Sequence, residues 1–355
     1  MNPTSSSSGD QTVRVPDSRR LLARCALPVP SVGFGAAAIG NLYEPVDDET
    51  AYAAVEEALC RGIRYFDTAP YYGYGLSEER LGSAIAWRST PDLVISTKVG
   101  RLIVAAETGA QVPDDGFAVS GRRALFDYSR EGVLRSIEGS LRRLRCDHVD
   151  ILLLHDIGRE THRERHEAAL RQALEEALPA MEGLKSSGVC RAIGIGVNEL
   201  EVCLEIMPRF DIDCILLAGR YTLLEQNAGS GSAAGGVLSE ALRRGVGILI
   251  GGPFNSGLLA RDRAPGATYN YRPADADTLR RTERIYAICG EAEIDVGAAA
   301  LQFPLAHPAV VSVIAGMRSP AEVASAAIRM ATKLPASLWD TLRNAGLLAD
   351  WIPTP

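Results

Sequence analysis

The sequence predicts an α/β fold, a closed (β/α)8 TIM barrel, and two features lead to that prediction. Short apolar runs alternate with longer amphipathic segments, and the alternation repeats eight times along the chain. Such alternation is typical of parallel βαβ units, and eight of them close most simply into a barrel. The alternative, a doubly wound open sheet, would need its phosphate site in the first turn between strand and helix.

The predicted strands are continuous apolar runs, as expected where both faces of a sheet are covered. In chain order they occupy residues 32–40, 63–69, 92–100, 148–156, 190–197, 213–219, 246–254 and 310–316. The predicted helices have apolar residues at helical spacing, and several begin with Ser or Asp and end at Gly. They occupy residues 47–62, 76–87, 129–145, 164–188, 199–210, 235–245, 276–292 and 319–332, with a further short helix in 295–306.

The chain divides into a tail and one domain. Residues 1–20 are polar and rich in serine, so we expect a disordered N-terminal tail followed by a single barrel domain over residues 21–355. The long segments 101–128 and 252–273 follow predicted strands. In a barrel both would lie at the C-terminal face. Loops of that length in a compact domain are usually functional or disordered.

Composition limits the classes of partner. The chain of 355 residues is 46% hydrophobic and has a net charge of -7, which gives no electrostatic reason to expect nucleic acid or an anionic membrane. Its seven cysteines form no C-x-x-C pair, which favours free thiols in a reducing compartment. His162 and His166 stand four apart without a third ligand, so we expect no metal. With no signal peptide and no membrane-length apolar run, we expect a cytoplasmic protein. The oligomeric state is left open.

Four polar residues stand at or just after predicted strand ends, where a barrel builds its chemistry. Asp67 ends the second apolar run, Lys98 the third and His155 the fourth, while Tyr72 lies in the loop after Asp67. Each alone has an ordinary structural interpretation, such as a turn cap or a packing tyrosine. Their convergence on one face of one barrel favours a catalytic site.

The four residue types suit proton transfer at a carbonyl or carbinol oxygen. A tyrosine has an ordinary pKa near 10, and a neighbouring ammonium lowers it, so we expect Tyr72 beside Lys98 to exchange a proton near neutral pH. Asp67 would neutralise the ammonium, and His155 would orient the substrate oxygen. The set contains no hydride carrier, so a redox cofactor would have to supply one.

The stretch "DTAPYYGYGLSEERLG" resembles the aldo-keto reductase signature D-T-A-x-x-Y-G-x-x-x-S-E, and "TKVG" and "LLLHD" resemble the lysine and histidine segments of that family. The resemblance covers about residues 27–330. It implies a (β/α)8 barrel that binds NAD(P)H without a Rossmann domain. It also implies a catalytic tetrad of Asp67, Tyr72, Lys98 and His155.

The resemblance implies two cofactor-binding segments as well. "GGPFNSGLL" resembles the pyrophosphate loop after the seventh strand, and "IAGMRSPAEV" resembles the adenosine segment after the eighth. The matching positions are Pro253, Phe254, Asn255, Ser256, Gly257 and Leu258 in the first and Gly316, Met317, Arg318 and Glu322 in the second.

The chain departs from the family pattern at three places. "IGIGVNE" replaces the usual Ser-Asn after the fifth strand, so either Asn198 holds the carboxamide or the register has changed. Ala218 stands where a Gln usually ends the sixth strand, and a late Glu-Asn pair is replaced by Ser325 and Ala326. Glu322 would repel the 2′-phosphate of NADP and Arg318 would attract it, which favours NAD but leaves NADP possible.

Within the family, "FDYSREGVLRSIEGSLRRL", "IGVNE" and "GRYTLLEQ" resemble the bacterial aldose 1-dehydrogenases that oxidise L-fucose and related sugars to a lactone. Pyridoxal 4-dehydrogenases are similar, and a general aldehyde or ketone reductase is a further alternative. The implied partner is a small carbonyl or sugar substrate. The residues expected from position to line its pocket are Tyr43, Tyr71, Tyr74, Asp156 and Arg220. A rival of another class is a non-catalytic cofactor-sensing module, as in subunits attached to ion channels.

Overall fold

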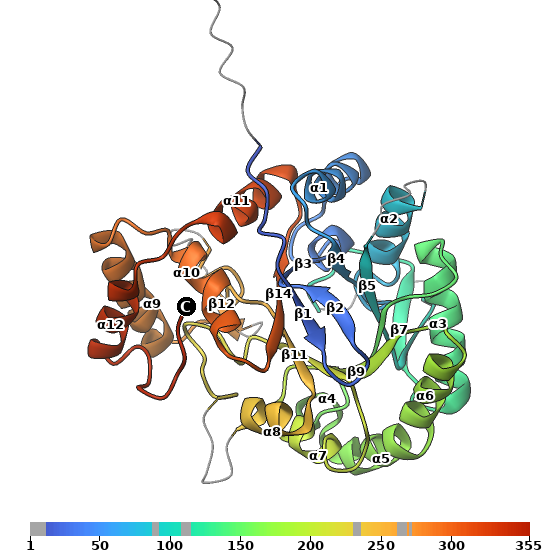
Figure 1. Ribbon diagram of the computed structural model, residues 1–355. Coiled ribbons are helices and arrows are strands. Elements are labelled where there is room, and N and C mark those ends of the chain that lie inside the picture. Colours follow the sequence, from blue (N-terminus) through green and yellow to red (C-terminus); the bar gives the residue numbers. More distant parts are fainter. Residues whose placement is uncertain (1–11, 87–91, 108–114, 230–235, 261–267, 270–271) are drawn as a thin grey trace, which may run out of the picture.

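Eight parallel strands form a closed barrel in the computed structural model, which describes residues 12–86, 92–107, 115–229, 236–260, 268–269 and 272–355. The prediction of a TIM barrel is therefore confirmed, and helices surround the strands (Figure 1). In chain order the barrel strands are β3 (Val32–Gly35), β4 (Tyr65–Asp67), β5 (Val94–Val99), β8 (Ile151–His155), β9 (Ala192–Val197), β10 (Cys214–Ala218), β11 (Gly247–Gly251) and β14 (Val310–Gly316). Because β14 pairs with β3, the last strand closes the ring against the first.

The helices fall close to the predicted segments, and several begin at the expected caps. Asp47 accepts from the Thr50 amide at 2.7 Å, and Ser129 accepts from the Gly132 amide at 3.0 Å. The helices are α1 (Asp48–Cys60), α2 (Leu76–Ile85), α3 (Arg130–Leu144), α4 (Arg159–His162), α5 (His166–Gln172), α6 (Leu178–Ser186), α7 (Leu200–Ile206), α8 (Val237–Arg244), α9 (Ala276–Glu291), α10 (Val296–Gln302), α11 (Pro320–Ala331) and α12 (Ala336–Asn344).

The segment 164–188 is not the one uninterrupted helix that the sequence predicts. A π-helical turn, Ala173–Ala177, separates α5 from α6, and a 3-10 turn, Arg163–Arg165, precedes α5. Pro179 lies in the first turn of α6. Because proline has no amide hydrogen, it cannot continue a regular ladder of helical hydrogen bonds, and the irregular turn lies just before it.

A hairpin that the sequence analysis did not predict closes the N-terminal end of the barrel. It consists of β1 (Arg19–Leu22) and β2 (Leu27–Pro30), which pair antiparallel. Leu22 and Leu27 pack with Tyr65 in the core of the barrel interior. Residues 1–11 of the expected tail lie outside the described residues, and β1 begins at Arg19, just before the expected domain boundary. The tail and the single-domain division stay predictions.

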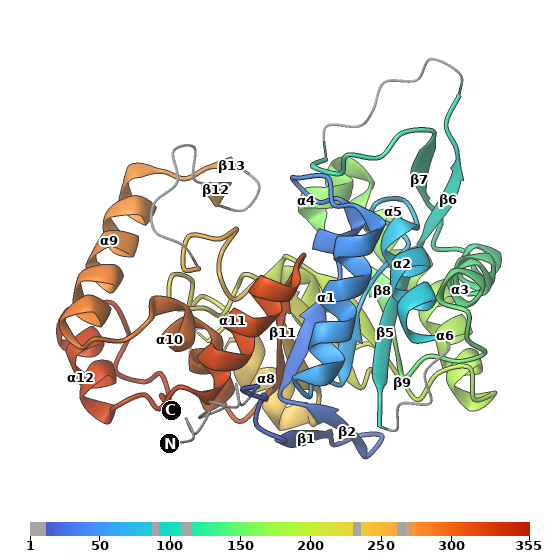
Figure 2. The same ribbon diagram turned by 90° about the horizontal axis from the view of Figure 1, so that it is seen from above.

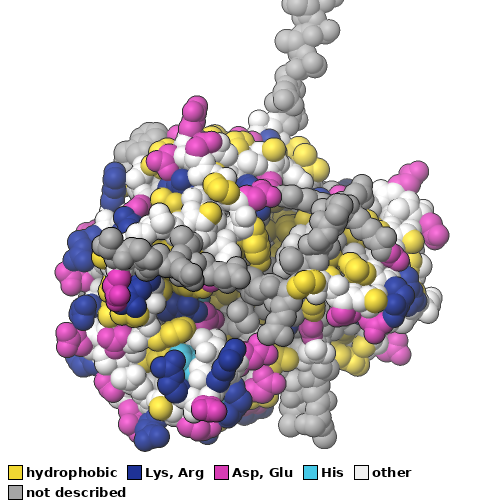
Figure 3. Space-filling model, turned by 180° about the vertical axis from the view of Figure 1, so that it is seen from behind, with side chains coloured by type: hydrophobic (Ala, Val, Ile, Leu, Met, Phe, Trp, Pro, Cys, Tyr) yellow, Lys and Arg dark blue, Asp and Glu magenta, His cyan; other side chains and the backbone are white. Residues whose placement is uncertain are grey.

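The opposite, C-terminal end carries the long segments that were expected there, and Figure 2 shows the two ends of the barrel from the side. β6 (Arg101–Ala105) pairs antiparallel with β7 (Arg122–Phe126), and β12 (Thr268–Tyr269) pairs with β13 (Arg272–Pro273). Figure 3 looks onto this end, where hydrophobic side chains gather in a hollow. Within the described residues, none of the helices has the length and apolar character that a membrane crossing requires.

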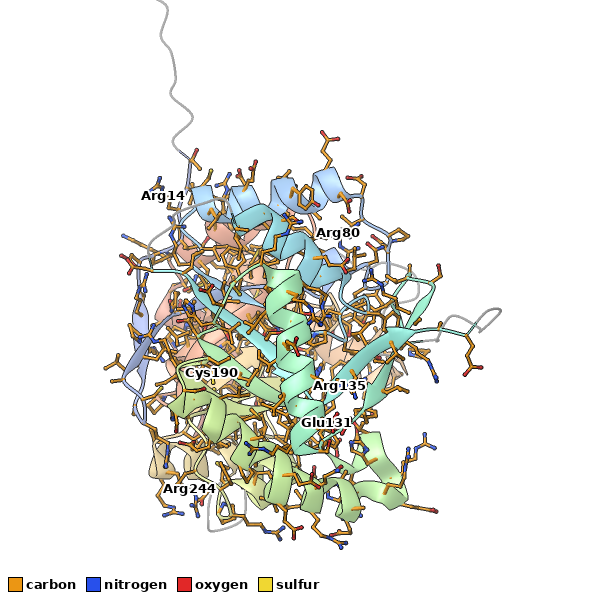
Figure 4. The ribbon with its side chains drawn as sticks, turned by 90° about the vertical axis from the view of Figure 1, so that its right-hand side faces the viewer. Arg14, Arg80, Glu131, Arg135, Cys190 and Arg244 are labelled. Atoms are coloured by element: carbon orange, nitrogen blue, oxygen red, sulfur yellow. The ribbon has the colours of Figure 1, made fainter. Side chains whose placement is uncertain are left out.

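The segment after β3 is held in place by one buried arginine, Arg80 of α2, which Figure 4 labels. Its guanidinium donates to the carbonyls of Ile39 and Val46 at 2.7 Å each and to the Asp48 carboxylate at 2.8 Å. Arg80 also donates to Asn41 Oδ1 at 2.9 Å. The segment from residue 39 to residue 48 therefore has a fixed path beside the barrel mouth. Figure 4 also shows α3 lying across this side of the barrel.

Candidate active site

Neighbouring strands β4 and β5 bring Asp67 and Lys98 together at the C-terminal mouth. Lys98 Nζ lies 2.9 and 3.1 Å from the two Asp67 carboxylate oxygens and donates to the Thr68 carbonyl at 2.9 Å. The Ser96 hydroxyl donates to the same carboxylate at 2.7 Å. The lysine is 1% exposed and the aspartate 4% exposed. Such burial is tolerable only because each charge is paired and hydrogen-bonded.

The lysine stem needs a glycine on the strand across from it. A Cβ placed on Gly196 of β9 would lie 3.3 Å from Lys98 Cε and 3.4 Å from Cδ. The glycine in "GIGV" therefore leaves room for the lysine to reach Asp67. A larger side chain there would displace the ammonium.

Tyr72 lies next to this pair, as the sequence analysis predicted. The Lys98 ammonium sits 4.5 Å from the centre of the phenol ring. The ring centre is 6.0 Å from that of His155, and Phe117 stacks on its other side with ring planes 27° apart. The structure thus brings together all four residues of the predicted tetrad.

The direction of the Tyr72 pKa shift corrects the sequence-based expectation. Burial raises the pKa of the Tyr72 phenol, Lys98 lowers it, and Asp67 raises it again, so the net pKa lies above the ordinary value. The expected net lowering is therefore wrong for the protein without bound ligands. The ammonium offsets only part of the cost of burying a phenolate.

His155 is buried and neutral. Burial lowers the pKa of the imidazole to about 3, with Asp156 opposing the shift and Arg101 and Lys98 reinforcing it. Its Nε2 lies 3.5 Å from an Asp156 carboxylate oxygen. Its Nδ1 is buried and has no hydrogen-bond partner within the described part of the chain. A neutral imidazole can donate to a substrate oxygen without adding charge to the site.

The tetrad depends on an αL turn at Gly73. Its φ is 62°, and a Cβ there would lie 2.3 Å from the Gly40 carbonyl oxygen. We predict that Gly73→Ala lowers kcat by at least tenfold, because the turn that carries Tyr72 must shift, and a displacement of about 1 Å can cost about 100-fold in rate.

The matched control for that prediction is Gly121→Ala. Gly121 has a φ of 79°, but no atom of the described residues lies within 4 Å of its Cβ position. In thermal unfolding, the control should lose about 1–2 kcal/mol of unfolding free energy, the cost of placing an alanine at a positive φ. The Gly73 variant should show a larger loss. Equal losses, with kcat unchanged in both, would contradict the role of the close approach.

The predicted pocket residues fall into two groups. Tyr71, Tyr74 and Asp156 lie beside the tetrad: the Tyr71 hydroxyl donates to Asp115 at 2.9 Å, and Tyr74 donates to the same carboxylate. Tyr43 is 46% exposed and forms a side-chain hydrogen bond with Ser256 in the loop after β11.

The fifth predicted pocket residue, Arg220, lies just after β10 and contacts the end of β9. Its Nε donates to the Asn198 carbonyl at 2.6 Å. This contact fixes the backbone just after β9 and does not involve the Asn198 side chain. Asn198 therefore remains the candidate to bind the carboxamide at that strand end. Ala218 ends β10 and offers no amide there. Tyr43 and Arg220 thus lie with the cofactor segments.

Three residues near the tetrad were missed: Arg101, Asp115 and Phe117. All three belong to the long segment 101–128, which carries no periodic pattern that would place its side chains. In the structure, residue 117 bridges to Leu42, and the Tyr43 amide donates to the Gly116 carbonyl at 2.7 Å. This part of the segment therefore lies against the loop after β3 and covers Tyr72.

The two cofactor segments lie side by side because β11 pairs with β14. In the first, Gly252, Asn255, Ser256 and Gly257 have φ values of 60°, 46°, 58° and 93°. The Thr222 hydroxyl donates to Asn255 Oδ1 at 2.6 Å. Asn255 Nδ2 is buried and, among the described residues, has no hydrogen-bond partner. The remaining predicted positions, Pro253, Phe254 and Leu258, belong to the same turn. An unpartnered amide in such a turn fits a polar ligand such as a pyrophosphate.

The second segment provides open space and a paired arginine. Gly316 ends β14 exposed, with no atom within 4 Å of its Cβ position, and Met317 is buried behind it. Arg318 contacts two carboxylates, Glu44 through Nη1 and Glu322 at 3.4 Å from Nε. The Arg318 amide also donates to Glu322 at 2.9 Å. The residues present thus fit the adenosine end of a dinucleotide.

Comparison with known proteins agrees with this geometry. A sequence model of the "Aldo/keto reductase family" matches residues 31–346. The pyridoxal 4-dehydrogenase of Microbacterium luteolum is 39% identical over 342 residues, which cover 93% of this chain and 98% of that protein. The D-threo-aldose 1-dehydrogenase of Pseudomonas sp is 39% identical over 338 residues, covering 94% and 98%.

The fold comparison gives the same result. The holo structure of an aldo-keto reductase from Bacillus halodurans matches with a TM-score of 0.71 and 28% identity, covering 92% of this chain and 95% of that one. A family match over most of the chain, a TIM barrel and relatives that are dehydrogenases agree with one another. The chain belongs to the aldo-keto reductase family and is an NAD(P)-dependent oxidoreductase.

Proposed function

We propose that the protein oxidises cyclic hemiacetals with NAD⁺, aldoses such as L-fucose first among them, and that the product is a lactone. The observation that carries this proposal is the set of polar groups around the tetrad. Beside Tyr72 and His155 lie the Asp115 carboxylate with two tyrosine hydroxyls and the Asp156 carboxylate with Arg101. A substrate with several hydroxyl groups finds a hydrogen-bond partner for each in such a site.

In the proposed reaction Tyr72 takes the proton of the anomeric hydroxyl, and His155 donates a hydrogen bond to the same oxygen. A bound nicotinamide coenzyme would supply the acceptor for the hydride that leaves the anomeric carbon. Lys98 stabilises the phenolate that must form, and Asp67 holds the ammonium in place. Hemiacetal and NAD⁺ become lactone, NADH and one proton.

The names of the two relatives support the hemiacetal as the shared substrate class. An aldose closes on itself through one of its own hydroxyls, and pyridoxal closes through the hydroxymethyl group beside its aldehyde. Both therefore present a ring carbon that bears one hydroxyl and one hydrogen. There are two alternatives. A pyridoxal dehydrogenase would use pyridoxal faster than any sugar, and a general reductase would use open-chain aldehydes and ketones fastest.

A substrate panel tests the proposal. L-fucose, pyridoxal, simple aldehydes and the methyl glycoside of L-fucose are each incubated with NAD⁺ or NADP⁺, and the free carbonyls also with the reduced coenzymes. We expect NADH formation and a lactone by NMR from the free sugar and none from the glycoside, which has no anomeric hydroxyl. Faster reduction of simple aldehydes than oxidation of any hemiacetal would overturn it.

We infer NAD as the preferred coenzyme from the pairing of Arg318. Two carboxylates, Glu44 and Glu322, already contact its guanidinium, and both would repel a 2′-phosphate. We predict that Glu44→Gln/Glu322→Gln raises the ratio of kcat/KM for NADP⁺ over NAD⁺ about tenfold, because two partly exposed charges contribute about 1.4 kcal/mol together.

The control for the coenzyme prediction is Glu49→Gln, an exposed glutamate in the first turn of α1. Its loss should leave the coenzyme ratio unchanged. If the double variant behaves like this control at low ionic strength, where charge effects are largest, Glu44 and Glu322 do not set the coenzyme choice.

A further inference from the structure

A second buried ion pair lies beside the tetrad. Arg101, the first residue of β6, donates from Nη2 to Asp156, and both side chains are 12% exposed. The guanidinium lies 3.8 Å from the centre of the Tyr71 ring and 4.4 Å from that of Phe126. One ion pair and two aromatic faces hold this arginine at a fixed position in the site wall.

The backbone next to His155 holds the Asp156 carboxylate toward the imidazole. Asp156 has a φ of 51°, a conformation that a non-glycine residue seldom adopts. The Tyr128 hydroxyl lies 2.8 Å from the carbonyl oxygens of His155 and of Asp156, and His162 Nε2 lies 3.0 Å from the second of them. With the carbonyls fixed in this way, the Asp156 carboxylate comes within 3.5 Å of His155 Nε2.

The environment of the two ring nitrogens determines where the single proton of a neutral His155 lies. Nδ1 is buried and has no partner among the residues that the structure describes, whereas Nε2 faces the Asp156 carboxylate. A buried N–H without an acceptor is rare and costly, so the proton belongs on Nε2. This tautomer presents an N–H donor beside the Asp156 carboxylate.

We propose that Arg101 and Asp156 are positioning residues that act through His155. The Asp156 carboxylate keeps the imidazole proton on Nε2. Its negative charge also favours a second proton on the imidazole, and the positive charge of the Arg101 guanidinium opposes that protonation. The pair thereby keeps His155 as a neutral donor. This proposal deepens the proposed function, because it rests on His155 orienting the substrate oxygen.

The surrounding charges agree with this division of roles. Burial lowers the pKa of His155, Asp156 raises it, and Arg101 and Lys98 lower it further. The titratable and charged groups near His155 are Asp67, Tyr71, Tyr72, Lys98, Arg101, Asp156 and, behind the backbone, Tyr128 and His162. Lys98 is already paired with Asp67. Removing Arg101 therefore leaves the Asp156 carboxylate without its own countercharge.

The test measures the imidazole directly in the protein without substrate. Nitrogen-detected NMR follows the ring nitrogens of His155, assigned by the signal that His155→Gln removes. In the wild type we expect one Nε2–H tautomer that does not take up a second proton above pH 5. In Arg101→Gln the pKa should rise above about 3, because one of the two charges that lower it is gone, while burial still holds it below the ordinary value.

The variants separate charge from structure. Arg101→Lys keeps a cation and should stay close to the wild type, and Arg101→Gln/Asp156→Asn should lose the new titration. Between pH 8 and pH 5.5, kcat/KM of Arg101→Gln should fall more than that of the lysine variant, since a larger share of the imidazole is then protonated. Arg123→Gln, in the partner strand β7, is the control for loss of an arginine and should not titrate differently.

Asp156→Asn alone tests the tautomer, and it does not depend on the Arg101 variants being folded. We expect it to give a mixture of Nδ1–H and Nε2–H forms, because the asparagine amide can donate to Nε2 as well as accept from it, which offsets the cost of a buried Nδ1–H. An unchanged tautomer in this variant, or no titration of His155 in folded Arg101→Gln, would overturn the proposal. Because the spectra need no substrate, either failure is distinct from a failed substrate panel, which would overturn only the proposed function.

Discussion

Tyr72→Phe is expected to lower kcat by about 10²–10⁴-fold, the range typical of losing a positioned general acid or base. The substitution removes one hydroxyl and keeps the ring that stacks on Phe117 and meets His155 edge to face. The dissociation constants of both coenzymes, measured by fluorescence titration, should therefore stay at their wild-type values. Steady-state oxidation of the best substrate from the panel gives kcat.

The direction of the Tyr72 pKa shift adds a pH signature to this prediction. Because burial raises the pKa above the ordinary value, the phenol is protonated at neutral pH in the free protein. Oxidation needs the phenolate as a base, so kcat in that direction should rise with pH on the alkaline side. Reduction needs the phenol as an acid and should not gain in the same way. Tyr72→Phe should lose the alkaline rise.

Tyr52→Phe is the matched control. Tyr52 lies in helix α1 and is partly buried against the hydrophobic core. It belongs to none of the strand ends or loops that carry the tetrad. Its hydroxyl should be dispensable. Wild-type turnover in Tyr72→Phe with coenzyme binding intact would show that another group transfers the proton, and the proposed mechanism would fail with it.

The sequence was sufficient for the barrel because each strand is a run of buried apolar residues bounded by amphipathic helices. β8, for example, is "ILLLH", buried throughout. The hairpin of β1 and β2 was missed because its strands are four residues each, and arginines and prolines interrupt the apolar pattern. The hairpin packs on a barrel end that is formed by residues distant in sequence. Local periodicity does not encode such contacts.

The tetrad was predictable for a related reason. Parallel strands end at one face, so a titratable residue closing an apolar run must meet its counterparts there. Arg101 and Asp115 escaped prediction because their positions depend on where an irregular segment folds back. Asp115 reaches Tyr71 and Tyr74 across 44 and 41 residues of sequence. The sign of the Tyr72 pKa shift was missed because sequence shows the neighbouring charge but not the depth of burial.

Lys98→Met is the second substitution for which we expect a large effect, and it acts on both stability and catalysis. It leaves the buried Asp67 carboxylate without its cation, which costs about 3–5 kcal/mol of unfolding free energy. It also removes the one neighbour whose charge lowers the pKa of Tyr72 most. Turnover should fall about 10²–10³-fold even where the protein remains folded.

A matched lysine stands at the other end of the barrel. Lys185 Nζ lies 2.7 Å from a carboxylate oxygen of Asp213, the buried residue just before β10. The same carboxylate accepts a hydrogen bond from the Ile193 amide. Lys185→Met therefore breaks the same kind of ion pair without touching the mouth. Denaturant unfolding should show a loss of stability in both lysine variants, but kcat should fall only in Lys98→Met.

The double variant Asp67→Asn/Lys98→Met separates the two effects of the lysine. Neutralising the stranded carboxylate should restore much of the unfolding free energy, since a buried polar amide costs far less than a buried unpaired charge. Turnover should stay low, because no ammonium remains to stabilise the Tyr72 phenolate. If kcat returned together with stability, the ion pair would serve the fold alone, and the electrostatic account of Tyr72 would have to be abandoned.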